Sequence, residues 1–513
     1  MERLDPKPLN VRRTDPKPSN EPARAAGENS FVFGSWLFLR LLALVHVIAF
    51  VSLWVQLEGL VGPDGLLPAA DYFPAVRAQL GSSAYARVPT LCWFFGAGTF
   101  LHVLCGAGVL FSLLLFSGIA PAVCLAALWA AYLSLNYAGQ VFFHFQWDTL
   151  LLETTLLALF FAPWSLLPLW RAYQPPAAAR LILWWLLFRL MFLAGVVKLA
   201  SGDSTWRDLS ALTFHYETQP LPTPLAWFAH QLPPWWHRAS CAGMFVLELA
   251  VPFFLFASRI LRHNAALLLI AFMVAVALTG NYTFFNLLAS VLCVACLDDA
   301  WWRAILPARA AWLRARAGEA PAPAARWQRM VAMPFAGFAI VYTLVQAMPS
   351  VAPRFGTFRE FRHLAQFIDP FRSLNNYGLF AVMTNPRPEL IFEGSDDRIQ
   401  WRAYEFKHKP GALTQQPTWV APHQPRLDWQ LWFAALGSPQ QNPWVISLCE
   451  HLLRGNPKVL ARLAGNPFPG KPPRFVRIVR YEYHFTDAAT RAATGHWWRR
   501  TPMDFYVPAA SLR

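Results

Sequence analysis

Charged residues are scarce in this sequence. They make up 14% of its 513 residues, whereas soluble globular proteins carry about 25%. Hydrophobic residues make up 56%, and the mean hydropathy is +0.31. The chain also has 24 Trp and 41 Phe, and aromatic residues are enriched where membrane proteins meet the lipid–water interface. The scarcity of charge excludes an ordinary soluble protein and predicts a polytopic membrane protein.

The short motifs of common enzyme sites are also missing. The sequence has no HExxH, no P-loop, no GxSxG and no dinucleotide fingerprint. The usual hydrolase and nucleotide sites therefore have no local support, and we predict neither a metal nor a cofactor.

Cysteine is sparse and unevenly placed. Of the seven Cys, only Cys449 lies beyond residue 300, which excludes a disulfide framework in the C-terminal third. Cys293 and Cys296 form a CVAC motif inside an apolar run. We expect these two thiols to pack in a helix, and a redox role stays open as the alternative.

Long apolar runs follow a polar N-terminal segment. Residues 1–34 are Pro-rich and contain DPKP twice, which predicts a disordered cytoplasmic tail. About nine runs are long enough to span a bilayer: 35–57, 97–116, 119–138, 149–169, 181–200, 240–257, 264–280, 283–298 and 329–348. The predicted membrane domain is therefore 35–349, and its first run is too long for a cleaved signal peptide.

The basic residues of the loops predict the orientation. With the N-terminus in the cytoplasm, the Arg-rich loops at 171–180, 259–262 and 303–316 all lie inside, as the positive-inside rule requires. Nine spans then place 350–513 outside. We interpret the net charge of +15 as topology signals and contacts with membrane lipids, not as a nucleic-acid surface.

The segment 350–513 has a different pattern, because its hydrophobic residues alternate. In the stretch Phe475–Phe485, apolar and polar residues take opposite faces of a predicted strand. Further strands are expected at 379–384, 389–393, 399–406 and 427–434, and a helix at 443–454. We predict a compact, mainly β domain with helical insertions.

Ionisable residues inside the apolar runs are costly in lipid and mark pairs or cavities. Depth along the predicted spans favours two ion pairs, Glu153 with Lys198 and Arg189 with Glu248. Arg189 and Lys198 are nine residues apart, so they lie on opposite faces of one helix. Structural pairing is one interpretation. The other is that Lys198, Glu153 and Asp148 line a functional cavity at the outer face.

Several long motifs resemble the lipase maturation factor family. They include GQVFFHFQWDTLLLETTLLALFFAPW, RLMFLAGVVKLASGDSTWRDLSALTFHYETQPLP, FRSLNNYGLFAVMT, EFKHKPG, HQPRLDWQLWFAAL and NPWVISLCEHLLRGNP. The resemblance covers about residues 35–510. It implies a membrane protein, of the endoplasmic reticulum in eukaryotes, that helps secreted lipases fold and assemble. The Ala/Arg/Pro-rich composition resembles that of a high-GC bacterium, which would place the chain in the inner membrane, facing the periplasm.

A more distant resemblance concerns the membrane part alone. The segment AGVVKL, followed by Trp206, is similar to the transmembrane part of vitamin K-dependent γ-carboxylases. There a matching lysine is implicated as the base that deprotonates a reduced quinone, a role that would fall on Lys198. The propeptide-binding portion of those enzymes is not recognisable here, so the resemblance supports a shared scaffold better than a shared reaction.

Two hypotheses follow. The first is a maturation factor that holds an exported, lipase-like client. Its candidate contacts are Trp206, His215, Tyr216, Glu217, Gln219, Asp428, Trp429, Gln430 and Trp432. The alternative for these residues is structural: a capping loop around His215 and a strand core around Trp429. The second hypothesis is a membrane enzyme that acts on a quinone or lipid, with Lys198 as base and Glu153 nearby.

Overall fold

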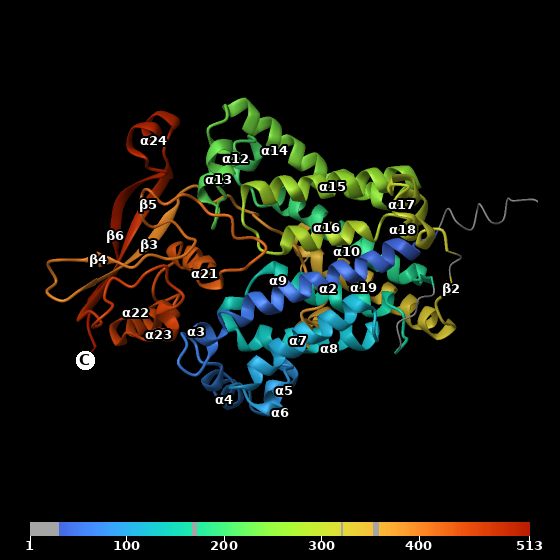
Figure 1. The fold of residues 1–513 in the computed structure, drawn as a ribbon, viewed down its shortest axis with the longest axis horizontal. Coiled ribbons are helices and arrows are strands. Elements are labelled where there is room, and N and C mark those ends of the chain that lie inside the picture. The colour runs from blue at the N-terminus through green and yellow to red at the C-terminus, as the bar shows by residue number, and fades with distance from the viewer. Residues whose placement is uncertain (1–29, 167–171, 320–321, 352–355, 357–358, 513) are drawn as a thin grey trace, which may run out of the picture.

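The computed structural model describes residues 30–512 except 167–171, 320–321, 352–355 and 357–358. Nearly all of the predicted tail 1–34 lies outside these residues. A bundle of helices forms the larger part, and a sheet with short helices, formed by the C-terminal region, packs against one end of it (Figure 1). The first helix among the described residues begins at Val32, three residues before the predicted start of the membrane domain.

Within the described residues, seven helices are long and apolar enough to cross a membrane, which supports an integral membrane protein. They are α2 (Val32–Trp54), α7 (Phe100–Ser117), α8 (Pro121–Ala138), α10 (Ala177–Ala200), α14 with η3 (Pro234–Phe256), α15 (Arg259–Thr279) and α19 (Arg326–Val351).

Two of the nine predicted runs take a different form. The run 149–169 corresponds to α9 (Gln146–Phe161), which has 16 residues and is about 24 Å long. The run 283–298 corresponds to α16 (Phe285–Val294), which is followed by α17 (Asp299–Ile305) at an angle of 104°. Counting that bent pair as one span gives eight. Hydropathy measures apolar character but not helix length or direction, so it could not separate these two from full spans.

Short elements fill the loops of the bundle. The loop after α2 holds α3 (Leu57–Val61), α4 (Ala69–Leu80), η1 (Gly81–Ser83), α5 (Ala84–Arg87) and α6 (Cys92–Phe95). η2 (Gln140–Phe143) precedes α9, and the loop after α10 holds α11 (Ser204–Arg207), α12 (Ala211–Thr218) and α13 (Pro224–His230). β1 (Tyr173–Gln174) pairs in parallel with β2 (Ala322–Pro323), next to α18 (Ala311–Arg316). After α19 come α20 (Arg359–Ile368) and η4 (Asp369–Phe371).

The C-terminal region is built on an antiparallel sheet in the order β4-β3-β5-β6. The strands are β3 (Pro388–Ser395), β4 (Arg402–Ala403), β5 (Phe475–Phe485) and β6 (Trp498–Ala510). The helices are α21 (Arg426–Ala435), α22 (Trp444–Arg454), α23 (Pro457–Leu460) and α24 (Ala488–Thr494). The predicted strands at 475–485 and 389–393 and the helix at 443–454 are confirmed.

Three strand predictions are wrong. The stretch 427–434 belongs to helix α21, 379–384 forms turns, and only Arg402–Ala403 is strand within 399–406. Helix α21 is buried on nearly every side, so it has no polar face to produce the 3.6-residue period of an exposed helix. For this reason, the pattern of its aromatic residues led to the wrong prediction of a strand.

One hydrophobic core runs through both parts. It joins residues of α2, α9 and α10 to Phe392 of β3 and Trp429 of α21. The ring of Trp429 meets that of Trp147 on α9 edge-on at 4.7 Å. The predicted domain boundary between 349 and 350 stays a prediction, but the two parts are packed as one unit.

Candidate functional site

Buried charged side chains, together with Asn375 and Tyr377, join the C-terminal region to the helical bundle. We call this set the junction: Asp148, Glu153, Arg189, Glu217, Asn375, Tyr377, Arg387, Glu389, Lys409, Arg426 and Asp428. Most of these charges are paired across long sequence separations, so the junction is where the two parts of the chain meet.

Arg426 links the start of α21 to α9. Its Nη2 lies 2.8 Å from Oδ1 of Asp148 and its Nη1 lies 3.0 Å from Oδ2. The guanidinium also donates to the Phe142 carbonyl (2.5 Å) and stacks 3.6 Å from the centre of the Phe143 ring. The Tyr132 hydroxyl donates to the same carboxylate. Both charged side chains are at most 1% exposed, so each depends on the other for compensation.

Glu153, one and a half turns further along α9, binds the segment 375–377. One carboxylate oxygen accepts from Arg189 of α10. The other accepts from the Tyr377 hydroxyl (2.7 Å) and from the backbone N–H (3.0 Å) and side chain (3.1 Å) of Asn375. Arg189 in turn donates to the Asn375 carbonyl at 2.6 Å. This one carboxylate therefore fixes a C-terminal segment to the middle of the bundle.

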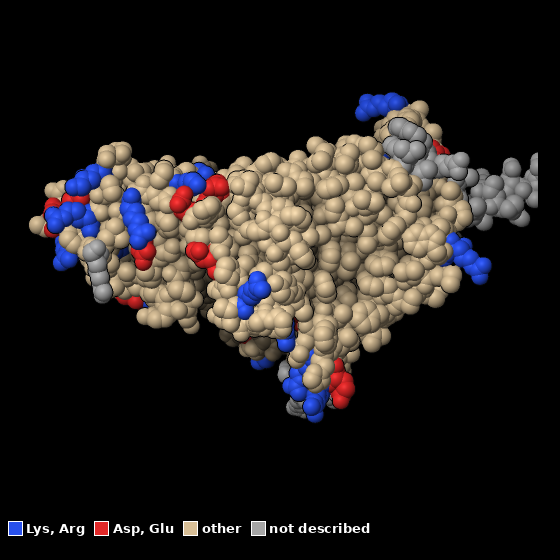
Figure 2. Space-filling view, turned by 90° about the horizontal axis from the view of Figure 1, so that it is seen from below, with Lys and Arg blue, Asp and Glu red and all other residues tan. Residues whose placement is uncertain are grey.

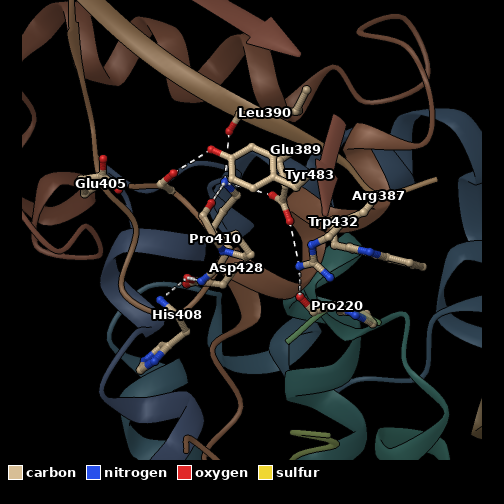
Figure 3. A network of polar contacts seen from close by, with 12 residues as sticks. Pro220, Arg387, Glu389, Leu390, Glu405, His408, Pro410, Asp428, Trp432 and Tyr483 are labelled. Atoms are coloured by element: carbon tan, nitrogen blue, oxygen red, sulfur yellow. Dashed lines mark hydrogen bonds and ion pairs between the residues drawn. The ribbon is translucent and has the colours of Figure 1, made fainter. Parts of the chain in front are cut away.

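Arg387, at the start of β3, holds the loop that follows α12. It donates to the carbonyls of Glu217 (2.5 Å), Gln219 and Pro220 (2.9 Å). Glu389 balances it at 2.9 Å, and Figure 3 shows Arg387 between Pro220 and Glu389. Lys409 makes an ion pair with the second oxygen of Glu389 at 3.1 Å. Burial lowers the pKa of Arg387.

The candidate client contacts on α21 are all buried. Asp428 accepts from the backbone N–H groups of His408 (2.8 Å) and Lys409 (3.0 Å), and burial raises the pKa of its carboxyl. Trp432 donates to the Thr218 carbonyl at 2.9 Å, and Gln430 to the Val141 carbonyl at 2.5 Å. Trp429, Gln430 and Trp432 thus hold α21 against the bundle, while Asp428 binds a segment of the C-terminal region itself.

The candidates in the loop after α10 are also directed inward. Trp206 is 2% exposed and donates to the Phe380 carbonyl at 3.1 Å. Glu217 accepts from the Phe485 N–H at 2.9 Å, and Gln219 donates to the Thr279 carbonyl at 2.8 Å. Tyr216 is buried among apolar residues.

His215 is the half-buried member of this group, beside the rings of Tyr282 and Phe380. Desolvation lowers its pKa to about 4. The structure thus buries eight of the nine predicted residues, and two of them, Glu217 and Asp428, belong to the junction. Contact with a client stays a prediction for all nine.

The predicted ion pairs are wrong, because the partners are exchanged. Arg189 pairs with Glu153, and Lys198 pairs with Glu248, both of whose oxygens lie 2.8 Å from the Lys198 amine. Helix α9 ends at Phe161, so Glu153 lies at its middle, level with Arg189 at the middle of α10. The prediction that Arg189 and Lys198 use opposite faces of α10 is confirmed, because one binds α9 and the other α14.

A cavity lined by Lys198, Glu153 and Asp148 stays a prediction. Each of the three has a different partner. The Lys198 amine also lies 5.4 Å from the centre of the Trp206 ring, and a role of Lys198 as a base stays a prediction. Cys293 and Cys296 are free and buried, and a redox role stays untested.

Sequence reasoning missed Arg387, Arg426, Asn375 and Tyr377. Hydropathy singles out a charge in an apolar run, but an Arg in a polar segment looks like any surface residue. Three of these residues do lie in the motifs quoted above, Asn375 and Tyr377 in FRSLNNYGLF and Arg426 in HQPRLDWQ. Those motifs were the signal that could have found them.

Comparison with known proteins gives matches to both parts of the chain. Residues 33–304 match the model of the lipase maturation factor transmembrane domain, and residues 373–508 match that of the lipase maturation factor C-terminal domain. No solved structure gives a significant match.

Curated relatives are similar over nearly the whole length. Lipase maturation factor 1 of Mus musculus is 35% identical, over 96% of this chain and 90% of the relative. Lipase maturation factor 2 of Homo sapiens is 35% identical, over 93% of this chain and 82% of the relative. Lipase maturation factor 1 of Bos taurus is 35% identical, over 93% and 88%. With both parts matched in order and joined by one buried junction, the chain belongs to the lipase maturation factor family.

Proposed function

We propose that this protein is a membrane-bound maturation factor that assists the folding or assembly of exported, lipase-like proteins. The observation that carries the proposal is the match of both parts of the chain, over 93–96% of its length, to proteins named lipase maturation factors. The junction supports it, because a rigid link between bundle and sheet presents the C-terminal region at a fixed place on the membrane.

The orientation we propose has the N-terminus inside and the C-terminal region outside. Arg259 and Arg262 pair with Asp298 (2.7 and 3.4 Å) beside α17, at the end of the bundle opposite the sheet (Figure 1). Positive charge gathers on the cytoplasmic side of membrane proteins. On the face shown in Figure 2, charged side chains cover the C-terminal region, while most of the bundle surface between it and the far end is uncharged.

Nine passages through the bundle fit this orientation. The Ala120 N–H donates to the Leu166 carbonyl (3.1 Å), which places the end of α9 beside the start of α8. Asp299 accepts from the Val32 N–H (2.8 Å), which places the end of α16 beside the start of α2. Helices α9 and α16 thus each return the chain to the proposed cytoplasmic end, although both are shorter than a full span.

The surface we propose for the client is the open edge of the sheet. β6 has β5 on one side and, among the described residues, no strand on the other. Its free backbone groups can pair with an extended segment. Pro502 and Pro508 lack an N–H and limit this pairing to 503–507. There Phe505 is 60% exposed, so the edge suits an extended, apolar segment of an incompletely folded client.

We propose a structural role for the nine candidate contacts, in support of this surface. Because eight of them are buried, we propose that they hold two elements in place, helix α21 and the loop after α10. They do not need to touch the client for this role.

The test is co-expression of this protein with a secreted lipase, in a host that lacks its own maturation factor. We expect the specific activity of secreted lipase, measured per amount of lipase protein, to rise with the wild-type chain. Phe505→Ser should reduce that rise. Ile446→Ser, another exposed apolar position of the C-terminal region, should not. Surface changes of this kind alter stability by only about 0.5 kcal/mol. Equal specific activity with and without the chain would sink the proposal.

A further inference from the structure

A pocket lies at the end of the bundle opposite the sheet. It forms where the start of α2, the α7–α8 turn, the segment after α9 and the end of α18 meet, and it contains about 430 Å³ of free space, part of it open to the exterior. We call it the arginine pocket and define it by Trp36, Arg40, Gly118, Ser165, Tyr173 and Arg316, which line it. Neither the junction nor the proposed client surface includes it.

Two guanidinium groups face this pocket from different helices. Arg40 of α2 lies 4.9 Å and Arg316 of α18 lies 5.4 Å from the centre of the same Trp36 ring. Arg316 is only 7% exposed. Arg40 is half-buried. Two cations on one indole repel each other, and burial of a charge is costly unless a counter-charge is present.

Neither guanidinium has a protein carboxylate as partner within the described part of the chain. Arg40 makes one long hydrogen bond, 3.4 Å to the Trp36 carbonyl. The Nε of Arg316 has no hydrogen-bond partner, and Glu319 acts on it only through longer-range attraction. Elsewhere in the protein, the buried arginines Arg189 and Arg426 also have an Nε without a partner, but each pairs with a carboxylate. The arginine pocket therefore has unused donors and uncompensated positive charge.

The remaining polar groups suit an anion. The buried Ser165 hydroxyl has no hydrogen-bond partner, and no acidic residue lines the pocket in the described segments. Gly118 has a φ of +83°, and a Cβ there would lie 2.5 Å from Nη2 of Arg40. Glycine at this turn leaves room for the guanidinium at the pocket wall. The donors and the missing acids together select a group with several acceptor oxygens.

The position of the pocket indicates which anion is available. The Trp36 ring meets that of Trp312 edge-on at 5.7 Å, and Trp312 is exposed. Tryptophan is enriched at the level of lipid headgroups. Arginine binds phosphate oxygens in a bidentate manner. We propose that the arginine pocket binds the phosphate group of an anionic phospholipid, held between Arg40 and Arg316, with the Ser165 hydroxyl as a further donor.

The experiment uses the full chain, purified in detergent and freed of lipid. Binding is measured by native mass spectrometry and by the shift in Tm on addition of phosphatidylglycerol, phosphatidylcholine or inorganic phosphate. The test variant is Arg40→Gln/Arg316→Gln. The control, Arg309→Gln/Arg314→Gln, removes the same charge from exposed positions of the neighbouring segment. Since a hydrogen bond to a charged group contributes about 1.5–3 kcal/mol, we expect the test variant to bind phosphatidylglycerol at least about 10-fold more weakly.

The control variant should retain wild-type affinity for phosphatidylglycerol. Equal binding by the test variant, or equal loss in the control, overturns the proposal, because binding would then not depend on these two side chains. A shift with phosphatidylglycerol alone supports a lipid headgroup as the source of the phosphate. An equal, Arg40-dependent shift with inorganic phosphate supports a free anion in the same site.

Should the Gln variant fail to fold, Arg40→Lys/Arg316→Lys keeps both charges but loses the bidentate geometry. It should bind phosphatidylglycerol more weakly than the wild type does. Unchanged affinity in the Lys variant would contradict recognition through the guanidinium forks.

Discussion

Charged side chains inside the protein are paired at one end of the helical bundle, whereas two at the other end lack a carboxylate partner among the residues that the structure describes. At the junction, Asp148, Glu153 and Arg387 each have a partner of opposite sign within hydrogen-bond distance. At the far end, Arg40 and Arg316 share one Trp ring and have no carboxylate partner among the described residues. Paired charges fix the two parts of the chain to each other. Charges left without a partner mark a place for something outside the chain.

The largest effect on the stability of the junction is expected from Arg426→Met. It leaves Asp148 buried without its cation and removes three hydrogen bonds and the stacking on Phe143. We expect the free energy of unfolding to fall by about 5 kcal/mol, the upper end of the range for a broken buried pair. Denaturant titration of the purified protein measures this.

The matched control is Arg480→Met, which breaks the half-exposed pair with Asp504 on the sheet. Pairs of that kind contribute less than about 1 kcal/mol. If the two substitutions cost the same, the junction does not stabilise the protein in the way described.

A second prediction concerns Lys198, for which a structural and a chemical role compete. Lys198→Met leaves Glu248 uncompensated and should cost about 3 kcal/mol. The double variant Lys198→Met/Glu248→Leu removes both charges and should recover most of that loss. Thermal unfolding of the single and double variants gives the stability comparison.

Lipase maturation by the same double variant gives the functional comparison. A structural pair predicts that maturation is retained. A folded double variant without any maturation activity would favour the hypothesis that Lys198 acts as a base.

The last prediction is a dependence of the protein's stability on pH. Burial, with help from the neighbouring charges of His408 and Arg426, lowers the pKa of His423 to about 4, and the neutral ring makes a 2.9 Å hydrogen bond with Ser52 of α2. A folded-state pKa below the unfolded value of about 6.5 means that the unfolded chain binds more protons between these values. Stability therefore falls as the pH is lowered from about 6.5 to about 4.

The slope for this one group is at most about 1.4 kcal/mol per pH unit. Unfolding of the wild type and of His423→Asn at a series of pH values measures the contribution of the ring. The Asn variant should show a flatter profile in this window, and parallel profiles would contradict the assignment.

Much of the fold could be predicted from the sequence, because apolar length and alternation report directly on spans and strands. The seven long helices, β3 and β5 agree with the pattern. Pairing could not be predicted, since it depends on which helices become neighbours. Glu153 and Lys198 looked level with each other only because α9 was expected to extend to residue 169. Arg387 and Arg426 gave no hydropathy signal, although they carry much of the junction.

The two carboxylates of α9 also have a consequence for the order of synthesis. Asp148 obtains its cation from Arg426, which emerges 278 residues later, and Glu153 binds Asn375, which emerges 222 residues later. Until those residues are made, α9 holds an acid with no counter-ion. We therefore expect α9 to be the last helix of the bundle to reach its final position. The membrane part would complete its folding only when the C-terminal region binds to it.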